Sequence, residues 1–282
     1  MKPLGEVLAL SVQYLKDRKV SSPRLVAETL LSHVLCMQRM DLYTKFECPL
    51  KESELAIIRG FLKRASLFEP VEYITAEVDF YGLRLPVSSH VLIPRQETEI
   101  LVDKAAAYIQ KRPIQNKILL DVCSGSGCIG LSLKNKFPEM TVFLSDMSDL
   151  ALTVSREGAA RHDLDVTFLQ GDLLKPFFGK KADYVFCNPP YISNKEYEEL
   201  EPSVKGYEPR GALVGGETGL EFYERLSRDL PDYLNPGAQV FLEIGYEQGK
   251  EMNKIFSASY WVQKELMQDW AGKDRFFFLE IE

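Results

Sequence analysis

The spacing of apolar residues over the first 70 positions predicts helices. Apolar side chains recur every three or four residues, the period that places them on one face of a helix. One such stripe contains Val7, Leu8, Leu10, Tyr14 and Leu15, and a second contains Leu25, Ala27, Leu30, Leu31, Val34 and Leu35. A third helix is predicted over residues 52–68. We therefore expect a small all-α bundle over residues 1–70.

The pattern changes to short β-like runs after residue 70. The runs over residues 71–80 and 83–87 flank Tyr81-Gly82, a pair typical of a hairpin turn. We expect a β-hairpin connector over residues 71–90. A helix that starts at or just before Thr98 and continues through Tyr108 belongs to the next domain, which we expect over residues 91–282.

Strands and helices alternate from residue 117 onward, the order typical of βαβ units and a parallel sheet. The predicted helices start near residues 127, 148, 219 and 247. Two further β-like runs at the end of the chain are joined by a short connection and should pair antiparallel. Together the strands predict a seven-stranded, mostly parallel sheet, from residues 117–121, 141–145, 165–169, 182–187, 238–244, 261–267 and 275–281.

Composition narrows the class of protein. The chain has 282 residues, 45% of them hydrophobic, and a net charge of −7, which disfavours a nucleic acid as a direct partner. No apolar run approaches the ~20 residues that span a bilayer, so no membrane association is expected. The five cysteines form no C-x-x-C pair, and with three histidines they show no zinc pattern. An odd cysteine count is typical of a reducing cytosol, so we expect a cytoplasmic protein.

A glycine-rich loop follows the first strand of the predicted sheet. Gly125, Gly127 and Gly130 satisfy G-x-G-x-x-G between a strand and a helix, which is a nucleotide-binding pattern but a weak one alone. Glycines and small side chains let the backbone approach a ligand closely. The loop residues that we expect at the cofactor are Cys123, Ser124, Gly125, Ser126 and Gly127.

Three acidic residues follow three successive strands. Asp146 can accept both hydroxyls of a ribose, and Asp172, which precedes Leu173, can accept from an adenine amino group. Asp121 discriminates between cofactors, because a carboxylate would oppose a pyrophosphate. It can instead hold the loop or face, through water, the cationic amino group of a methionine moiety.

The tetrapeptide Asn188-Pro189-Pro190-Tyr191 ends a predicted buried strand. Two prolines cannot continue a sheet ladder, so the chain must leave as a stiff loop with Asn188 at the carboxyl end of the strand. Ligands bind at that edge of open α/β sheets. The spacing indicates an amide-like or amino-like acceptor.

These motifs, in this order, resemble class I (Rossmann-like) S-adenosylmethionine methyltransferases, and more narrowly the HemK/PrmC family of glutamine N5-methyltransferases that act on peptide chain release factors. The resemblance covers nearly the whole chain. It rests on residues 21–25, 80–82, 92–99, 207–213 and 215–220, together with the glycine loop and the Asn-Pro-Pro-Tyr motif.

The resemblance implies a substrate, a cofactor and further site residues. The substrate would be the Gln of a Gly-Gly-Gln loop in a release factor, and the cofactor S-adenosylmethionine. Leu92 and Arg95 would contact the cofactor, and the first 70 residues would help to recognise the protein substrate. Two positions depart from the family pattern: Cys123 replaces the first glycine of the loop, and Gln96 replaces the second proline of Pro-Arg-Pro-Glu-Thr-Glu.

The resemblance also implies a catalytic arrangement. We expect the Asn188 side-chain oxygen and the Pro189 carbonyl to accept the two N–H groups of the substrate amide, which turns its nitrogen toward the methyl group. Pro190 would stiffen the loop, and Tyr191 would offer a flat wall for the amide. We expect the enzyme to act as a monomer.

Other functions stay open on the sequence. The closest alternative is glutamine methylation of a ribosomal protein, and a second is amino-group methylation of DNA or RNA bases, which requires a flipped base and a basic grip on the backbone. A dehydrogenase is favoured by the literal glycine pattern but disfavoured by Asp121 and by the Asn-Pro-Pro-Tyr loop. A binding module without enzymatic activity is a further possibility.

Overall fold

The computed structural model describes residues 2–282, which form two compact units. The first unit contains the chain up to Ala76 together with Glu201–Tyr207. The second contains Glu77–Leu200 and Glu208–Glu282.

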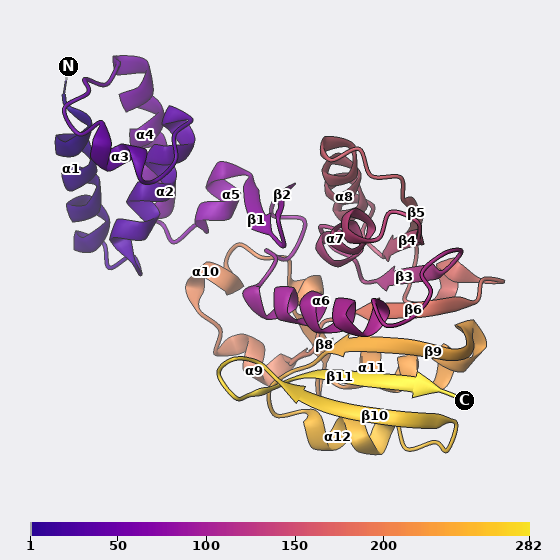
Figure 1. Ribbon diagram of the computed structural model, residues 1–282. Helices are drawn as coiled ribbons and strands as arrows, with labels where there is room; N and C mark the ends of the chain where they lie inside the picture. The colour runs from indigo at the N-terminus through magenta and orange to yellow at the C-terminus, as the bar shows by residue number, and fades with distance from the viewer. Residues whose placement is uncertain (1) are drawn as a thin grey trace. The chain divides into compact units, whose positions relative to one another are not determined.

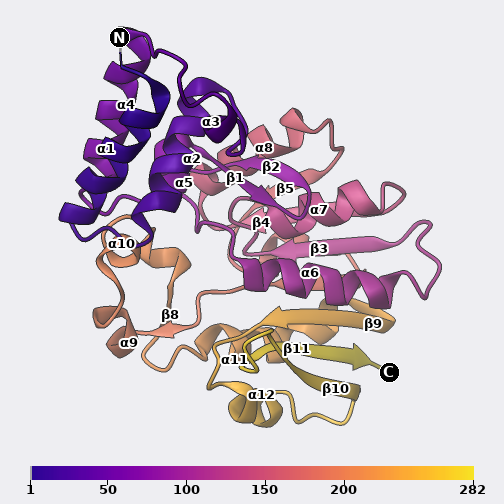
Figure 2. The ribbon, with the colours of Figure 1, turned by 60° about the vertical axis from the view of Figure 1, so that its left-hand side comes forward.

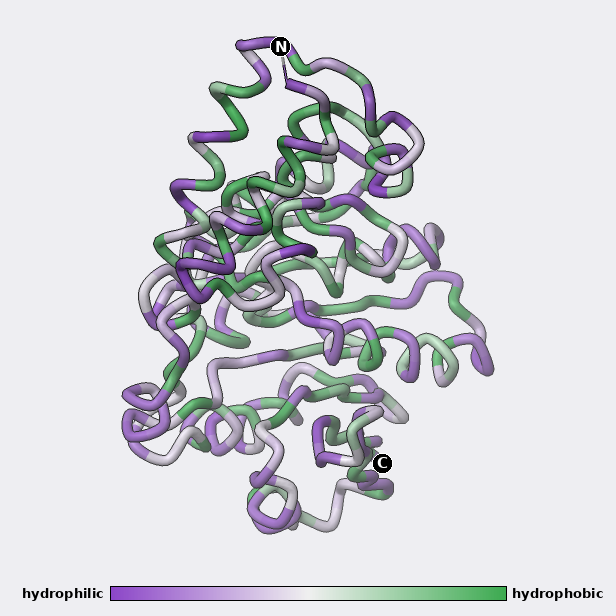
Figure 3. Tube along the Cα trace, turned by 90° about the vertical axis from the view of Figure 1, so that its left-hand side faces the viewer, coloured by the Kyte–Doolittle hydropathy of each residue, from purple (hydrophilic) through white to green (hydrophobic). Residues whose placement is uncertain are grey.

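The first unit is helical. Its core is apolar, and Leu8, Leu15, Leu30 and Leu31 of the predicted stripes are buried there. Leu10 and Leu25 were assigned to the same stripes but are 51% and 47% exposed, because each lies on the outer side of its helix. In Figure 3 the helices nearest the N-terminus alternate between hydrophobic and hydrophilic residues within each turn. The helices are α1 (Leu4–Asp17), α2 (Pro23–Leu35), α3 (Asp41–Thr44), α4 (Glu52–Ala65), α5 (Val71–Thr75) and α10 (Pro202–Lys205).

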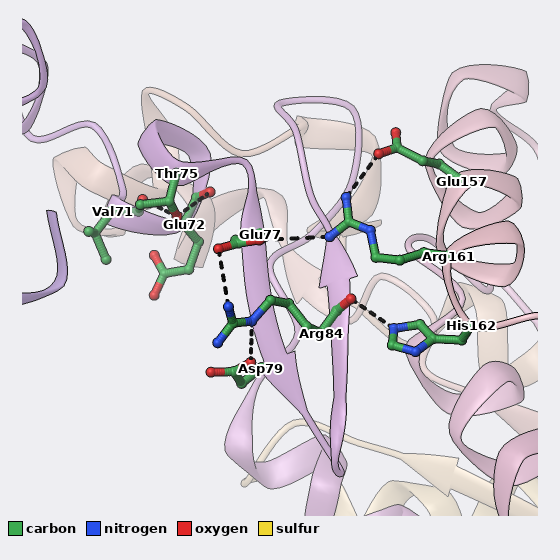
Figure 4. Close-up of polar contacts among 9 residues, drawn as sticks. All are labelled: Val71, Glu72, Thr75, Glu77, Asp79, Arg84, Glu157, Arg161 and His162. Atoms are coloured by element: carbon green, nitrogen blue, oxygen red, sulfur yellow. Dashed lines mark hydrogen bonds and ion pairs between the residues drawn. The ribbon is translucent and has the colours of Figure 1, made fainter. Parts of the chain in front are cut away.

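The strand prediction for residues 71–75 is wrong, because these residues form helix α5. Val71 and Ile74 both reach the helical core, which a spacing of three allows in a helix but not in a strand. The Thr75 hydroxyl donates to the carbonyls of Val71 (3.0 Å) and Glu72 (3.3 Å), which reinforces the turn (Figure 4).

The rest of the predicted hairpin is confirmed as β1 (Glu77–Phe80) and β2 (Leu83–Pro86), which pair antiparallel around Tyr81-Gly82. Its apolar side chains belong to the core of the second unit. Figure 4 shows polar contacts between this hairpin and α8 (Asp149–Arg161): Arg161 pairs with Glu77, and the His162 ring contacts the carbonyl of Arg84 at 2.9 Å.

A seven-stranded sheet forms the centre of the second unit, in the order β10-β11-β9-β6-β3-β4-β5 (Figure 1). Five strands are parallel neighbours, and β11 pairs antiparallel with both β9 and β10. The predicted sheet is therefore confirmed. Its strands are β3 (Ile118–Val122), β4 (Thr141–Asp146), β5 (Thr167–Gln170), β6 (Ala182–Cys187), β9 (Leu234–Glu243), β10 (Trp261–Gln268) and β11 (Asp274–Ile281).

Helices cover both faces of this sheet (Figure 2). One face packs against α6 (Gln96–Ile109), α7 (Cys128–Lys136) and α8, and the other against α11 (Glu221–Asp229) and α12 (Gly249–Ile255). Residues alternate between the two cores: Leu119 and Phe186 face the first helical layer, whereas Leu120 and Cys187 face the second. Burial on both faces explains why the strands read as continuous apolar runs.

The segment after β6 forms short elements that the sequence did not predict. Strand β7 (Ile192–Ser193) pairs parallel with β8 (Val214–Gly216), and α9 (Asn194–Glu198) lies between them in the chain.

Short 3-10 helices occupy Lys175–Phe177 before β6, and Arg210–Ala212 and Leu230–Tyr233 after it.

The order of the strands indicates where on the sheet a ligand would bind. The chain runs from β3 outward through β4 to β5, then returns to β6 on the other side of β3. The direction of winding therefore reverses between β3 and β6. Open α/β sheets bind ligands at such a switch point, outside the carboxyl ends of the strands.

Candidate functional site

A cavity of about 390 Å³ lies at this switch point, within the second unit. Loops that follow β3, β4, β5 and β6 contribute to its wall, together with the segment that precedes α6. Most of the residues predicted from the sequence line it, namely Leu92, Arg95, Cys123, Ser124, Gly125, Ser126, Asp146, Asp172, Leu173, Asn188 and Pro190.

The glycine loop has one position where the sequence departs from the pattern and one where only glycine fits. Cys123 adopts a φ of +57°, a left-handed conformation that glycine adopts without strain. Gly127 has a φ of +78°, and an added Cβ would lie 2.1 Å from the Ser155 hydroxyl oxygen. Gly127 therefore permits close packing of the loop on α8, whereas Cys123 to Ser126 face the cavity.

Asp146 connects the ends of two strands at the cavity. Its Oδ2 accepts from the backbone N–H of Gly125 and its Oδ1 from that of Ser148, both at 2.9 Å. Burial raises the pKa of this carboxyl, and these N–H groups oppose the rise. Each carboxylate oxygen keeps further acceptor capacity toward the cavity.

Asp121 is fully buried and lies outside the lining of the cavity. Its Oδ2 accepts from the Gly130 N–H at 2.8 Å, so the side chain holds the first turn of α7. Burial raises the pKa of this carboxyl to about 7. Of the two roles predicted for Asp121, the geometry matches that of holding the loop.

Asp172 and Leu173 line the cavity beyond β5. The Asp172 carboxylate accepts from Arg225 at 2.6 Å and from Lys175 at 2.8 Å, and these partners lower its pKa. A contact of Asp172 with adenine would therefore share an oxygen with a cation.

The four residues of the Asn-Pro-Pro-Tyr motif have different surroundings. Asn188 and Pro190 line the cavity, whereas Pro189 is buried. Tyr191 packs against the hydrophobic core on the α11 side of the sheet, and burial raises the pKa of its hydroxyl. The predicted role of Tyr191 as a wall for the substrate amide stays a prediction.

The backbone of this motif is held by glycines and by Gln248. An added Cβ would lie 2.3 Å from the Pro190 carbonyl oxygen at Gly215, and 2.2 Å from that of Tyr191 at Gly219. The Gln248 amide donates to the Tyr191 carbonyl at 3.0 Å. These glycines therefore bring two segments of backbone together.

Sequence reasoning missed three further residues of the site. Glu208 is buried, accepts from the Ile93 N–H at 3.3 Å and pairs with Arg95, which fixes the segment carrying Leu92. Thr98, which also lines the cavity, donates to Glu243 and contacts Asn188. The available signal for Glu243 was its place at the end of a predicted strand, where it is a fourth acid after Asp121, Asp146 and Asp172.

The residues that line the cavity fit a nucleoside cofactor with a cationic end. The cavity combines an open loop backbone at Gly125, where an added Cβ would meet no atom within 4 Å, with the carboxylates of Asp146 and Asp172. The fold and these residues define the class I S-adenosylmethionine-dependent methyltransferases.

Comparisons with known proteins identify the family. The family model "PrmC N-terminal domain" matches residues 6–75, and "Methyltransferase small domain" matches residues 97–201. The chain is 40% identical to the release factor glutamine methyltransferase of Chlamydia trachomatis serovar L2, over 98% of this chain and 94% of that protein. It is 37% identical to the protein of that name from Geobacter sulfurreducens, over 96% and 94%. The chain belongs to the release factor glutamine methyltransferase family.

A solved structure agrees with the fold. A T. thermophilus 16S rRNA methyltransferase, in complex with AdoMet and guanosine, superposes with a TM-score of 0.53 at 14% identity, over 73% of this chain and 50% of that chain. Across residues 2–282, no helix is both long and apolar enough to cross a bilayer. The same residues contain no group of three or more His, Cys, Asp or Glu side chains placed to hold a metal ion.

Proposed function

We propose that this protein transfers a methyl group from S-adenosylmethionine to the side-chain amide nitrogen of the Gln in the Gly-Gly-Gln motif of a peptide chain release factor. The observation that carries the proposal is Asn188 of the Asn-Pro-Pro-Tyr motif on the wall of the switch-point cavity, in a chain of this family. Methylation of a ribosomal protein or of nucleic acid bases is not favoured by the relatives.

The cofactor would occupy the cavity beside the glycine loop. Asp146 would accept from ribose hydroxyls, Asp172 or the backbone near Leu173 would receive the adenine, and Leu92 and Arg95 would contact the cofactor from the segment before α6. When bound, S-adenosylmethionine supplies an electrophilic methyl group on a sulfonium, and it would leave as S-adenosylhomocysteine. The Asp146 carboxylate would contribute a negative potential, which favours a cationic ligand.

Asn188 and Pro189 would position the substrate. An amide nitrogen is a poor nucleophile, because its lone pair is delocalised into the carbonyl. The Asn188 Oδ1 and the Pro189 carbonyl would accept its two N–H groups, which orients the lone pair toward the methyl and stabilises the developing positive charge. The alkylated nitrogen is acidic and loses a proton to water or a nearby acceptor.

The helical unit would contribute to recognition of the protein substrate. Its helices α1 and α4 border a groove of about 420 Å³, which is lined by apolar side chains such as Val7 and Ile58 and by basic residues. One chain carries both the cavity and the amide-holding motif, which supports action as a monomer. The proposed substrate works at the ribosome, which supports a cytoplasmic location.

The test is transfer of labelled methyl from S-adenosylmethionine to purified release factor. A Gln→Ala variant of its Gly-Gly-Gln motif and duplex DNA serve as parallel substrates. We expect label on the wild-type release factor alone. Label on DNA, or equal label on the Gln→Ala variant, would contradict the proposed substrate.

A further inference from the structure

Two side chains lie beside the Asn188 amide and contact one another, and one of them, Thr98, also lines the cavity. Glu243 ends strand β9 and is 1% exposed, and Thr98 lies in the first turn of α6. The Thr98 hydroxyl donates to Glu243 Oε2 at 2.7 Å, and the Asn188 Nδ2 lies 3.5 Å from the Thr98 hydroxyl oxygen. Strands β6 and β9 pair with Cys187 opposite Leu242. Asn188 and Glu243 are the next residues of the two chains, so they lie side by side at the same edge of the sheet.

The chemistry of these groups decides which way the amide turns. A threonine hydroxyl has one hydrogen, and Thr98 gives it to Glu243. Toward Asn188 the Thr98 oxygen can then only accept. A carboxylate also only accepts, and Glu243 lies beside Asn188 at the ends of the paired strands β9 and β6. Both neighbours can therefore bond only to the NH2 group of Asn188. The oxygen Oδ1 then faces away from them.

We propose that Glu243 and Thr98 are positioning residues that select the orientation of the Asn188 amide, so that its oxygen is presented to the substrate nitrogen. This inference rests on the proposed function. With the amide reversed, Asn188 would direct an N–H toward the N–H groups of the substrate, and the acceptor would be lost. The two orientations have nearly the same shape, so packing alone cannot choose between them.

The selection depends on the charge of Glu243. Burial raises the pKa of its carboxyl to about 7, whereas the hydroxyl of Thr98 and the guanidinium of Arg275 oppose the rise. A protonated Glu243 could donate to the Thr98 oxygen or to Asn188 Oδ1, and the demand for the NH2 end would disappear. Turnover should therefore increase as pH rises through about 7. The titratable and charged groups that act on Glu243 or feel its charge come from several elements: Glu97, Cys128, Tyr191, Tyr223 and Arg275.

The experiment compares Thr98→Val, Thr98→Ser and Glu243→Gln with the wild type on release factor. Thr98→Val keeps the shape but removes the hydroxyl, and we expect kcat to fall about 10- to 100-fold, while the KM for release factor and the Kd for S-adenosylmethionine stay within a few-fold. Thr98→Ser keeps the hydroxyl and should retain most of the wild-type kcat. Glu243→Gln should lower kcat and remove the increase in turnover near pH 7. Thr153→Val on the exposed side of α8 is the matched control.

The outcomes separate the inference from the proposed function. Absence of transfer by the wild-type enzyme to release factor would overturn the proposed function itself. Wild-type transfer with kcat unchanged in Thr98→Val would overturn the positioning role, as would an equal loss in Thr98→Ser. Thermal unfolding and cofactor binding identify a variant that fails to fold. If Glu243→Gln fails to fold, the comparison of Thr98→Val with Thr98→Ser still tests the inference.

Discussion

At the scale of the residue, Asn188 is the group whose removal should separate chemistry from binding. It lines the cavity, but the glycine loop and Asp146 form a different part of the wall. Asn188→Ala should lower kcat about 100-fold or more, because one preorganised partner of the reacting group is lost. The Kd for S-adenosylmethionine, measured by calorimetry, should stay within a few-fold. An equal loss of cofactor affinity would contradict the assigned role.

Asp146 should have the opposite effect. We expect Asp146→Ala to weaken S-adenosylmethionine binding about 10- to 100-fold, because hydrogen bonds to a charged group contribute about 1.5–3 kcal/mol. The variant also loses the carboxylate that accepts from Gly125 and Ser148. Asp172→Ala in the same assay tests the adenine contact. An unchanged Kd in Asp146→Ala would refute the ribose contact.

At the scale of the element, the segment 214–219 supports the Asn-Pro-Pro-Tyr loop. Gly219 has a φ of +78° and faces the Tyr191 carbonyl, so Gly219→Ala must shift one of the two backbones. We expect kcat to fall about tenfold or more from misplacement of Asn188, with a free energy of unfolding reduced by more than about 1 kcal/mol.

Gly60→Ala is the matched control for this substitution. Gly60 lies within α4, and an added Cβ there meets no atom within 4 Å. Alanine should increase stability by about 0.5–1 kcal/mol and leave kcat unchanged. If Gly219→Ala behaves like Gly60→Ala in both assays, the segment does not support the loop.

At the scale of the whole molecule, buried carboxyls lower the free energy of unfolding at neutral pH. Asp121 has a pKa raised to about 7 by burial, whereas the pKa of an unfolded aspartate is near its ordinary value of 3.8. Between these values the folded state binds more protons, so this contribution to stability is complete below the lower value and is lost as pH rises through about 7.

Asp121→Asn removes this titration and should keep the acceptor for the Gly130 N–H. The free energy of unfolding of Asp121→Asn relative to wild type should therefore rise from pH 5 to pH 8, by at most about 1.4 kcal/mol per pH unit. Urea unfolding at several pH values measures this difference. Asp165→Asn, at an exposed position, is the control. The same difference at every pH would contradict the raised pKa.

The sheet, its strand directions and part of the cavity wall were predictable from local pattern. Strands buried on both faces produce long apolar runs, and the residues at their carboxyl ends are recognisable by type and place. The helix at residues 71–75 was not predictable in this way, because five mixed residues fit either structure until the position of the core is known.

The sequence by itself determined the class of fold, the family and part of the cavity wall, because each depends on local periodicity and ordered motifs. Only the tertiary structure decided which acid does what. Asp121, Asp146, Asp172 and Glu243 all lie at or just after the carboxyl end of a strand. Yet one holds a helix, one connects two strand ends, one pairs with cations and one accepts from Thr98 beside Asn188. Burial and partners set these roles, and both arise from residues far apart in the chain.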